Sequence, residues 1–131
     1  SMTAPVITSV NVECNSDNQV AILVSFTADG DGILLGDGYG ACEFTDTCYP
    51  SRLYFYYQAN GYWSIASNGY RVKLKSGTLN NGVVEMNLTY NGNCVPGKTA
   101  REAIALQYGT NYLWKVELMN KCNQRSNQMS F

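Results

Sequence analysis

Residues 110–120 read Thr-Asn-Tyr-Leu-Trp-Lys-Val-Glu-Leu-Met-Asn, and apolar and polar side chains alternate along them. Alternation with a period of two is typical of a β-strand that buries one face. The side chains expected to face the core are Tyr112, Trp114, Val116 and Leu118, and those expected to face outward are Asn111, Lys115 and Glu117. The stretch therefore predicts an antiparallel sheet with one face against a core.

Strand-like runs of the same kind recur elsewhere at intervals of roughly 8–12 residues, the spacing of a sandwich or barrel. Residues 19–28 place Val20, Ile22, Val24 and Phe26 on one face. The other expected strands are residues 6–13, 52–59, 62–67, 70–75, 83–90 and 127–131. Asn-Gly dipeptides, which favour tight hairpin turns, stand at 60–61, 68–69, 81–82 and 91–92. We expect one all-β domain spanning residues 1–131, although Ala, Arg and Glu in residues 99–107 also allow helical turns.

Composition excludes several function classes. The 131 residues have a formal net charge of −1, 45% hydrophobic side chains and no His. The near-zero charge gives no global attraction to nucleic acid or to an anionic membrane, and no segment approaches the ~18 apolar residues of a membrane span. The lack of His excludes Ser-His-Asp and Cys-His catalysis and HExxH zinc sites, and there is no nucleophile elbow or phosphate-binding loop. We therefore expect that the protein is not an enzyme.

The charges are distributed unevenly along the chain. Residues 1–51 hold seven acids and no bases, whereas residues 52–131 hold nine bases and three acids. Residues 29–50, rich in Gly and Asp, are typical of a long loop. Asp29, Asp31 and Asp37 in this loop offer oxygen ligands of the kind that Ca²⁺ takes, although their spacing is not that of an EF-hand. The competing interpretation is that this is simply a flexible, solvated loop. We therefore expect no cofactor, and Ca²⁺ is the candidate ligand if the loop does bind one.

Aromatic side chains crowd into residues 49–63. They are Tyr49, Tyr54, Phe55, Tyr56, Tyr57, Tyr62 and Trp63. Because neighbours on a strand face opposite ways, some of these rings must point away from the core, where they would stack on sugars or anchor a protein interface. Two competing interpretations are that the long loop covers these rings, or that the rings only form cross-strand pairs within the hairpin. We take Tyr54, Tyr56, Tyr62 and Trp63 as the candidate partner- or glycan-binding residues, and expect the basic stripe Arg71, Lys73 and Lys75 to face solvent or the chain's own acids.

Residues 106–116, Leu-Gln-Tyr-Gly-Thr-Asn-Tyr-Leu-Trp-Lys-Val, resemble the late signature of fibronectin type III domains. The signature is a Leu, a turn pair, Thr-x-Tyr and two alternating apolar residues, so its fold-defining residues here are Leu106, Thr110, Tyr112 and Trp114. Tyr112 occupies the place of the tyrosine corner, whose hydroxyl returns to upstream backbone. The resemblance implies an immunoglobulin-like antiparallel β-sandwich of seven to nine strands.

The resemblance also assigns the strands, in two alternative registers. In the preferred one, residues 69–74 open strand C, residues 83–90 form strand C′ and residues 99–105 form strand E. Residues 29–67 are then an insertion that carries the acidic loop and an aromatic hairpin. In the alternative register, residues 52–59 are themselves strand C of a nine-strand, variable-type sandwich.

In the preferred register four of the five cysteines gather at one end of the sandwich. They are Cys42, Cys48, Cys94 and Cys122, and we expect the pairs Cys42–Cys48 and Cys94–Cys122. Cys14 lies at the opposite end, out of reach of a partner, so a bond from Cys14 to any of the four would contradict the register too. Disulfides persist outside the cytoplasm, which predicts an extracellular, cell-surface or virion location.

The expected function is a non-catalytic extracellular binding or structural module. It would be part of a surface adhesin, a secreted multidomain protein or a phage or virion structural protein, and would work through disulfide-braced loops at one end of the sandwich. The alternative is a carbohydrate-binding module that uses exposed Tyr and Trp. Either function implies a protein or glycan partner, with adjacent domains of a larger chain as a further candidate, and neither nucleic acid nor a membrane span.

Overall fold

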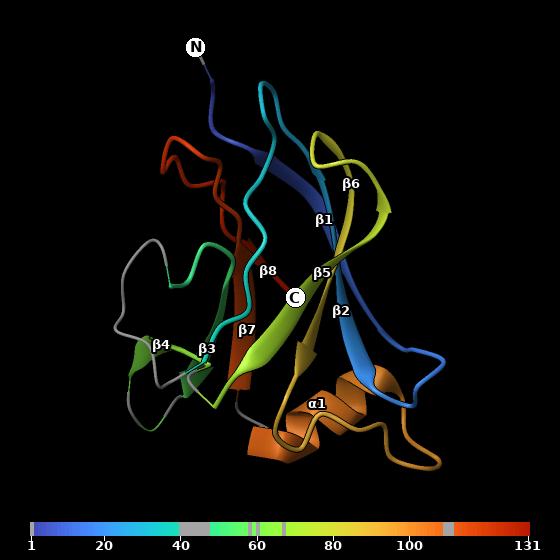
Figure 1. Ribbon diagram of the computed structural model, residues 1–131. Helices are drawn as coiled ribbons and strands as arrows, with labels where there is room; N and C mark the ends of the chain where they lie inside the picture. The colour runs from blue at the N-terminus through green and yellow to red at the C-terminus, as the bar shows by residue number, and fades with distance from the viewer. Residues whose placement is uncertain (1, 40–47, 58, 60, 67, 109–111) are drawn as a thin grey trace.

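The structure, a computed structural model, describes residues 2–39, 48–57, 59, 61–66, 68–108 and 112–131. These residues form eight strands and one helix (Figure 1). In chain order they are β1 (Val6–Cys14), β2 (Val20–Thr27), β3 (Arg52–Tyr57), β4 (Tyr62–Ile65), β5 (Tyr70–Gly77), β6 (Asn81–Leu88), α1 (Ala100–Tyr108), β7 (Tyr112–Glu117) and β8 (Met129–Ser130). No helix among the described residues has the length and apolar character that a membrane crossing requires.

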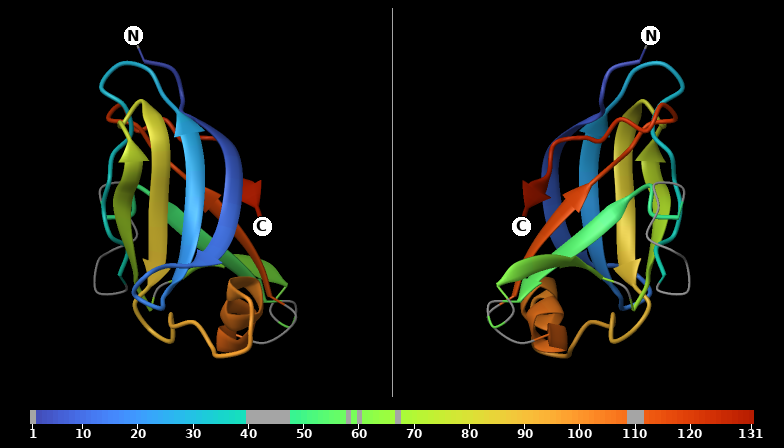
Figure 2. Two further views of the ribbon diagram at one scale, coloured as in Figure 1. Left: turned by 90° about the vertical axis from the view of Figure 1, so that its right-hand side faces the viewer. Right: turned by 90° about the vertical axis from the view of Figure 1, so that its left-hand side faces the viewer.

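The strands form two four-stranded antiparallel sheets. The first sheet has the order β1-β2-β6-β5 and the second has the order β4-β3-β7-β8. Figure 2 shows the two sheets as facing layers, with α1 across one end. The prediction of an all-β sandwich of seven to nine strands is confirmed.

The core lies between the sheets and is built from the alternating strands that the sequence indicated. Val20, Ile22, Val24 and Phe26 of β2 are all buried, as expected. On the second sheet Leu53 of β3 and Trp114 and Val116 of β7 are buried. Each of these strands therefore presents one apolar face to the other sheet.

Residues 52–57 form a strand of the sandwich itself rather than an added hairpin. β3 lies between β4 and β7 and pairs with β7 from Arg52↔Glu117 to Tyr57↔Tyr112. β5 and β6 both belong to the first sheet, where β6 pairs directly with β2. The preferred register is therefore wrong. The alternative one agrees in its central strand, which is β3 (Arg52–Tyr57), but the described residues form eight strands rather than nine. The physical reason is that Leu53 is fully buried and the Phe55 ring packs 6.1 Å from the Trp114 ring.

Residues 100–108 are helical, so the assignment of residues 99–105 to a strand is wrong. The hydroxyl of Thr99 accepts a hydrogen bond from the backbone N–H of Glu102 at 3.1 Å, which caps the helix. Ala103 and Ile104 are buried, and α1 packs against β1 and β2 (Figure 2). The helix thus closes one end of the core, and Leu106 of the expected signature lies within it.

Only some of the Asn-Gly dipeptides mark hairpins. The paired strands β3 and β4 flank the dipeptide 60–61, of which Asn60 lies outside the described residues. Residues 68–69 join β4 to β5, which belong to different sheets. The β5–β6 turn is instead closed around Thr78, with Asn81–Gly82 already inside β6. Residues 91–92 precede α1 rather than a strand.

The outer edges of the first sheet are covered by loops. At the β5 edge, a carboxylate oxygen of Asp37 accepts a hydrogen bond from the backbone N–H of Val72 at 2.8 Å, and Gly38 exchanges backbone bonds with Tyr70. At the β1 edge, the Asn127 amide bonds both the N–H and the carbonyl of Ile7. These contacts occupy backbone groups that would otherwise be open to pairing with another chain.

A disulfide joins Cys14 to Cys94, with the two Cα atoms 6.1 Å apart. The expected pair Cys94–Cys122 is wrong, because Cys122 is a free, exposed thiol. Cys94 follows β6 at the same end as the β1–β2 turn, where its N–H donates to the carbonyl of Asn18 at 2.8 Å. Cys48 is itself disulfide-bonded, and its expected partner Cys42 lies outside the described residues.

Candidate binding surface

The outward side of the second sheet carries aromatic residues from two strands, with an apolar and a basic residue from a third beside them. Because Leu53, Trp114 and Val116 point into the core, their neighbours along each strand point outward. We define the aromatic face as Tyr54 and Tyr56 of β3, Trp63 of β4, and Leu113 and Lys115 of β7. The register places Tyr54 opposite Lys115 and Tyr56 between Trp63 and Leu113. β3 and β7, which carry this face, are turned toward the viewer in the right panel of Figure 2.

Lys115 lies between two of these rings. Its Nζ is 4.3 Å from the centroid of the Trp63 ring and 5.1 Å from that of Tyr54. The rings of Tyr56 and Trp63 are in tilted contact, with centroids 5.5 Å apart. An ammonium over aromatic faces is held by the ring quadrupoles, so this lysine has a defined position on the sheet.

A buried carboxylate borders the aromatic face. Glu117, only 5% exposed, lies 3.7 Å from Nη1 of Arg52 and 3.6 Å from Nε of Arg125. It accepts hydrogen bonds from the Tyr54 hydroxyl at 3.1 Å and from the Gln128 amide at 2.9 Å. Burial raises the pKa of Tyr54, and the Glu117 charge adds to this rise, so the phenol stays protonated as the donor.

The structure brings together three of the four predicted binding residues. Tyr54, Tyr56 and Trp63 share the outward side of the sheet, as their hairpin register requires. Tyr62 precedes Trp63 on the same strand and so belongs to the opposite side, where it is 61% exposed. Lys115 and Leu113 were not among the predicted binding residues, because they come from a strand about 50 residues farther along the chain.

The acidic loop does not bring its three predicted ligands together. The carboxylate of Asp29 accepts hydrogen bonds from the hydroxyl of Thr3 at 2.8 Å and from its N–H at 3.0 Å, and these hold the pKa of Asp29 below its ordinary value. Asp37 is bonded to the β5 edge, while Asp31 is exposed. Within the described residues, no three acidic or cysteine side chains form a group that could hold a metal ion.

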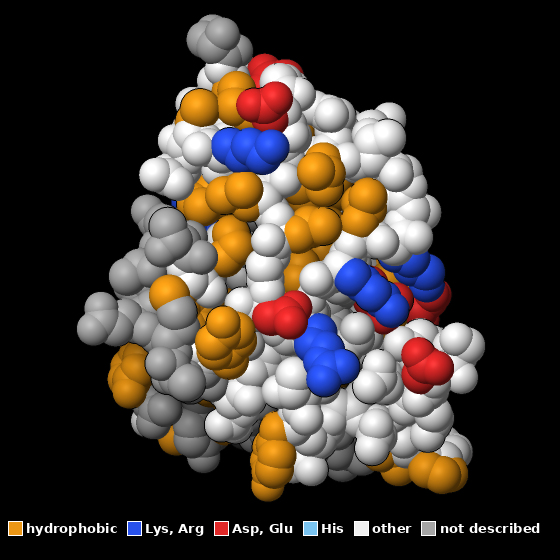
Figure 3. Space-filling view, in the orientation of Figure 1, with side chains coloured by type: hydrophobic (Ala, Val, Ile, Leu, Met, Phe, Trp, Pro, Cys, Tyr) orange, Lys and Arg blue, Asp and Glu red, His pale blue; other side chains and the backbone are white. Residues whose placement is uncertain are grey.

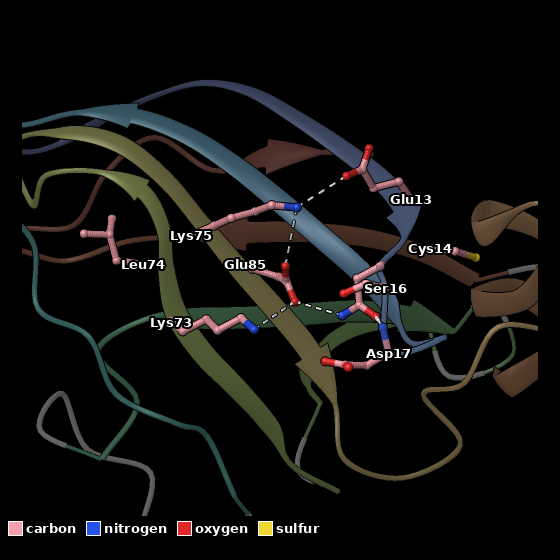
Figure 4. Close-up of a pocket in the computed structure, with 9 residues that line it drawn as sticks. Glu13, Cys14, Ser16, Asp17, Lys73, Leu74, Lys75 and Glu85 are labelled. Atoms are coloured by element: carbon pink, nitrogen blue, oxygen red, sulfur yellow. Dashed lines mark hydrogen bonds and ion pairs between the residues drawn. The ribbon is translucent and has the colours of Figure 1, made fainter.

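A second polar site lies on the outward side of the first sheet, in an open groove of about 480 Å³. Figure 4 shows Glu85 at its centre, between the side chains of Lys73 and Lys75. Glu85 is 2% exposed, accepts hydrogen bonds from the amides of Asn87 (2.9 Å) and Asn15 (3.1 Å), and lies 3.6 Å from Nζ of Lys73. Lys75 Nζ lies 3.7 Å from Glu85 and 3.5 Å from Glu13. The prediction that this stripe faces the chain's own acids is confirmed for both lysines.

Burial alone would raise the pKa of Glu85. The amide hydrogen bonds and the two lysine charges outweigh burial and hold the pKa below its ordinary value of 4.5. A carboxyl group whose pKa is lower in the folded protein stabilises the fold above its unfolded-state pKa. That contribution is lost as the pH falls through the folded-state pKa.

We therefore expect Glu85→Gln to lower the melting temperature more at pH 7 than at pH 3. At pH 3 the wild-type carboxyl is partly protonated and has lost part of its stabilising effect, so the melting temperatures of the two proteins should be closer together. Thermal unfolding followed by circular dichroism at both pH values measures the difference. Asp17→Asn, at an exposed position in the neighbouring turn, controls for the loss of one charge. An equal Glu85→Gln effect at both pH values would contradict this expectation.

The side of the molecule shown in Figure 3 differs from the aromatic face. There, hydrophobic side chains form small separated groups, and most acidic side chains lie next to basic ones. Such a mixed surface is ordinary for a globular protein.

Comparisons with known proteins were made at three levels. No protein-family model, no curated protein and no solved structure matches the chain. A function for this chain therefore has to rest on its fold and on the aromatic face.

Proposed function

We propose that this chain is a non-catalytic, extracellular, immunoglobulin-like module, similar to fibronectin type III domains, that binds a protein partner through the aromatic face. Its strand orders β1-β2-β6-β5 and β4-β3-β7-β8 correspond to A-B-E-D and C′-C-F-G in such sandwiches. Tyr112 begins β7, the position of strand F, which agrees with the tyrosine-corner resemblance. The Cys14–Cys94 bond supports an oxidising compartment and therefore a secreted, surface or virion protein.

The observation that carries the proposal is the set of three aromatic side chains, one fixed cation and one exposed leucine on a single sheet surface. Leu113, 57% exposed, lies opposite Tyr56. Tyrosine and tryptophan with an adjacent apolar group are the residues that dominate protein interfaces. The sequence indicated both the loop end and the aromatic residues as binding surfaces, and of these we keep the aromatic residues on the side of the second sheet and leave out the loop end.

A carbohydrate-binding module, the alternative function, is less well supported by this geometry. Sugars stack on the open face of an aromatic ring, but the Lys115 ammonium already lies over the rings of Trp63 and Tyr54. A stacked sugar would have to displace this cation. A protein side chain can instead pack beside the cation and the ring edges.

We expect Trp63→Ala to weaken binding to the partner at least tenfold, the effect of losing a central aromatic anchor. The partner is to be captured from the secreted and surface proteins of the source organism by cross-linking, and the affinity is then measured with purified components. Tyr90→Ala is the matched control, since Tyr90 is 61% exposed and follows β6, a strand of the first sheet.

Two results would contradict the proposal. One is an equal loss of affinity in Trp63→Ala and Tyr90→Ala. The other is reproducible binding on a glycan array that Trp63→Ala abolishes, which would establish the carbohydrate-binding function instead.

A further inference from the structure

We propose that Lys115 determines the specificity of the aromatic face, and that the partner segment it recognises is an acidic stretch of polypeptide. This rests on the proposed function and names the chemistry of its partner. The central observation is a cation that is held in place but has no acidic partner among the described residues.

Lys115 differs from the lysines of the opposite sheet. Lys73 and Lys75 both pair with Glu85, and Lys75 also pairs with Glu13. Within the part of the chain that the structure describes, no Asp or Glu lies within ion-pair distance of Lys115. Its contacts are instead with the rings of Tyr54 and Trp63. The charge of Lys115 is thus positioned but not neutralised.

The surrounding charges leave this surface positive. In the four strands of the second sheet the charged residues are Arg52, Lys115 and Glu117. Glu117 is buried and lies within ion-pair distance of Arg52 and Arg125. The carboxylate is therefore already engaged, so among the charged residues of these four strands it is the ammonium of Lys115 that a ligand approaching the sheet meets. Charge complementarity selects a carboxylate.

Placement between two rings also favours binding. A free lysine loses much side-chain freedom when it is immobilised in an interface. The rings of Tyr54 and Trp63 already restrict Lys115, so less freedom remains to be lost when a carboxylate arrives. The exposed side chain of Leu113 on the same strand adds an apolar contact, which favours an Asp or Glu that has a hydrophobic neighbour.

The test begins with a displayed library of random 12-residue peptides selected on the folded wild-type protein. We expect the selected peptides to be enriched in Asp and Glu beside apolar residues. Their affinity should fall at least tenfold in Lys115→Gln and in Trp63→Ala. Lys121→Gln, an exposed lysine outside the sheet, is the matched control and should bind as the wild type does. Rising NaCl should weaken wild-type binding more than Lys115→Gln binding, because exposed charge pairs are screened.

The outcomes separate the inference from the function on which it rests. Failure to select any peptide whose binding depends on Trp63 would count against the proposed function itself. Peptides that depend on Trp63 but show no excess of acids, or that bind Lys115→Gln unchanged, would overturn the role of Lys115 alone. Binding of polygalacturonate, an acidic polysaccharide, that depends on Lys115 while acidic peptides fail would also overturn the proposal. Unchanged thermal unfolding of Lys115→Gln confirms that the variant is folded.

Discussion

Replacing both Cys14 and Cys94 with serine is expected to lower the free energy of unfolding by about 4 kcal/mol. The disulfide joins residues separated by 80 positions, so it restricts a long loop of the unfolded chain. It also ties the β1–β2 turn to the segment before α1, where Val20 N–H donates to the carbonyl of Gly92. Because small domains are stable by only roughly 5–15 kcal/mol, this is a large share of the total. Urea unfolding of the oxidised wild type and of the double variant measures the loss.

Cys122→Ser is the matched control for this experiment. Its thiol is free and exposed, and surface substitutions of this kind change stability by less than about 0.5 kcal/mol. Equal urea midpoints for the wild type and the double variant would contradict the expectation. So would a non-reducing peptide map that links Cys94 to Cys122.

Glu117→Ala is expected to destabilise the protein by about 3 kcal/mol, because it removes the negative charge from a buried ion-pair network. Arg52 and Arg125 would lose the carboxylate between them, and both side chains are largely shielded from water, at 14% and 19% exposure. Arg125 also donates to the carbonyls of Pro50 and Tyr49. Loss of the carboxylate would therefore loosen the connection between the segment before β3 and the chain that follows β7.

Urea unfolding of the wild type and of Glu117→Ala measures this loss of stability. Asp31→Ala, which removes an exposed carboxylate, controls for the change in net charge. If both variants lose the same small amount of stability, the buried carboxylate does not hold these segments together. A double-mutant cycle with Arg125→Ala then separates the coupling energy of the Glu117–Arg125 pair from the other effects of the two substitutions.

The sequence predicts those parts of the fold that depend on local alternation. β2 and β7 were recognised from their own side chains, and Ile22, Val24, Trp114 and Val116 are buried as expected. Local pattern could not decide which strand lies beside β7. That choice depends on the pairing of Arg52–Tyr57 with Tyr112–Glu117, which are about 60 residues apart.

One signal in the sequence could have prevented two errors. Thr99-Ala-Arg-Glu102 has the spacing of a capping box, Ser or Thr followed three residues later by Glu. With residues 100–108 taken as a helix after β6, Cys94 moves to the same end as Cys14. The wrong strand and the wrong disulfide therefore have one cause, the preference for a family pattern over a local helix signal.

The candidate site was predictable only in part. Tyr56 and Trp63 share a side because they flank one hairpin, and that follows from the sequence. Lys115 was expected to face outward, but its position between Tyr54 and Trp63 depends on the neighbouring strand. Glu117 was expected to face outward too, yet it is buried beside Arg52 and Arg125. Glu85 is also buried, and it bonds to Asn15, which lies 70 residues earlier in the chain.

The proposed function requires that the partner binds at the aromatic face. Nuclear magnetic resonance shift mapping with the captured partner or with a selected peptide tests this requirement directly. We predict that the largest backbone shift changes fall on Tyr54, Tyr56, Trp63, Leu113 and Lys115. Residues of the loops at the end near Cys122, such as 29–33 and 121–125, should change little. Shift changes that are largest in those loops and absent from β3, β4 and β7 would contradict the account.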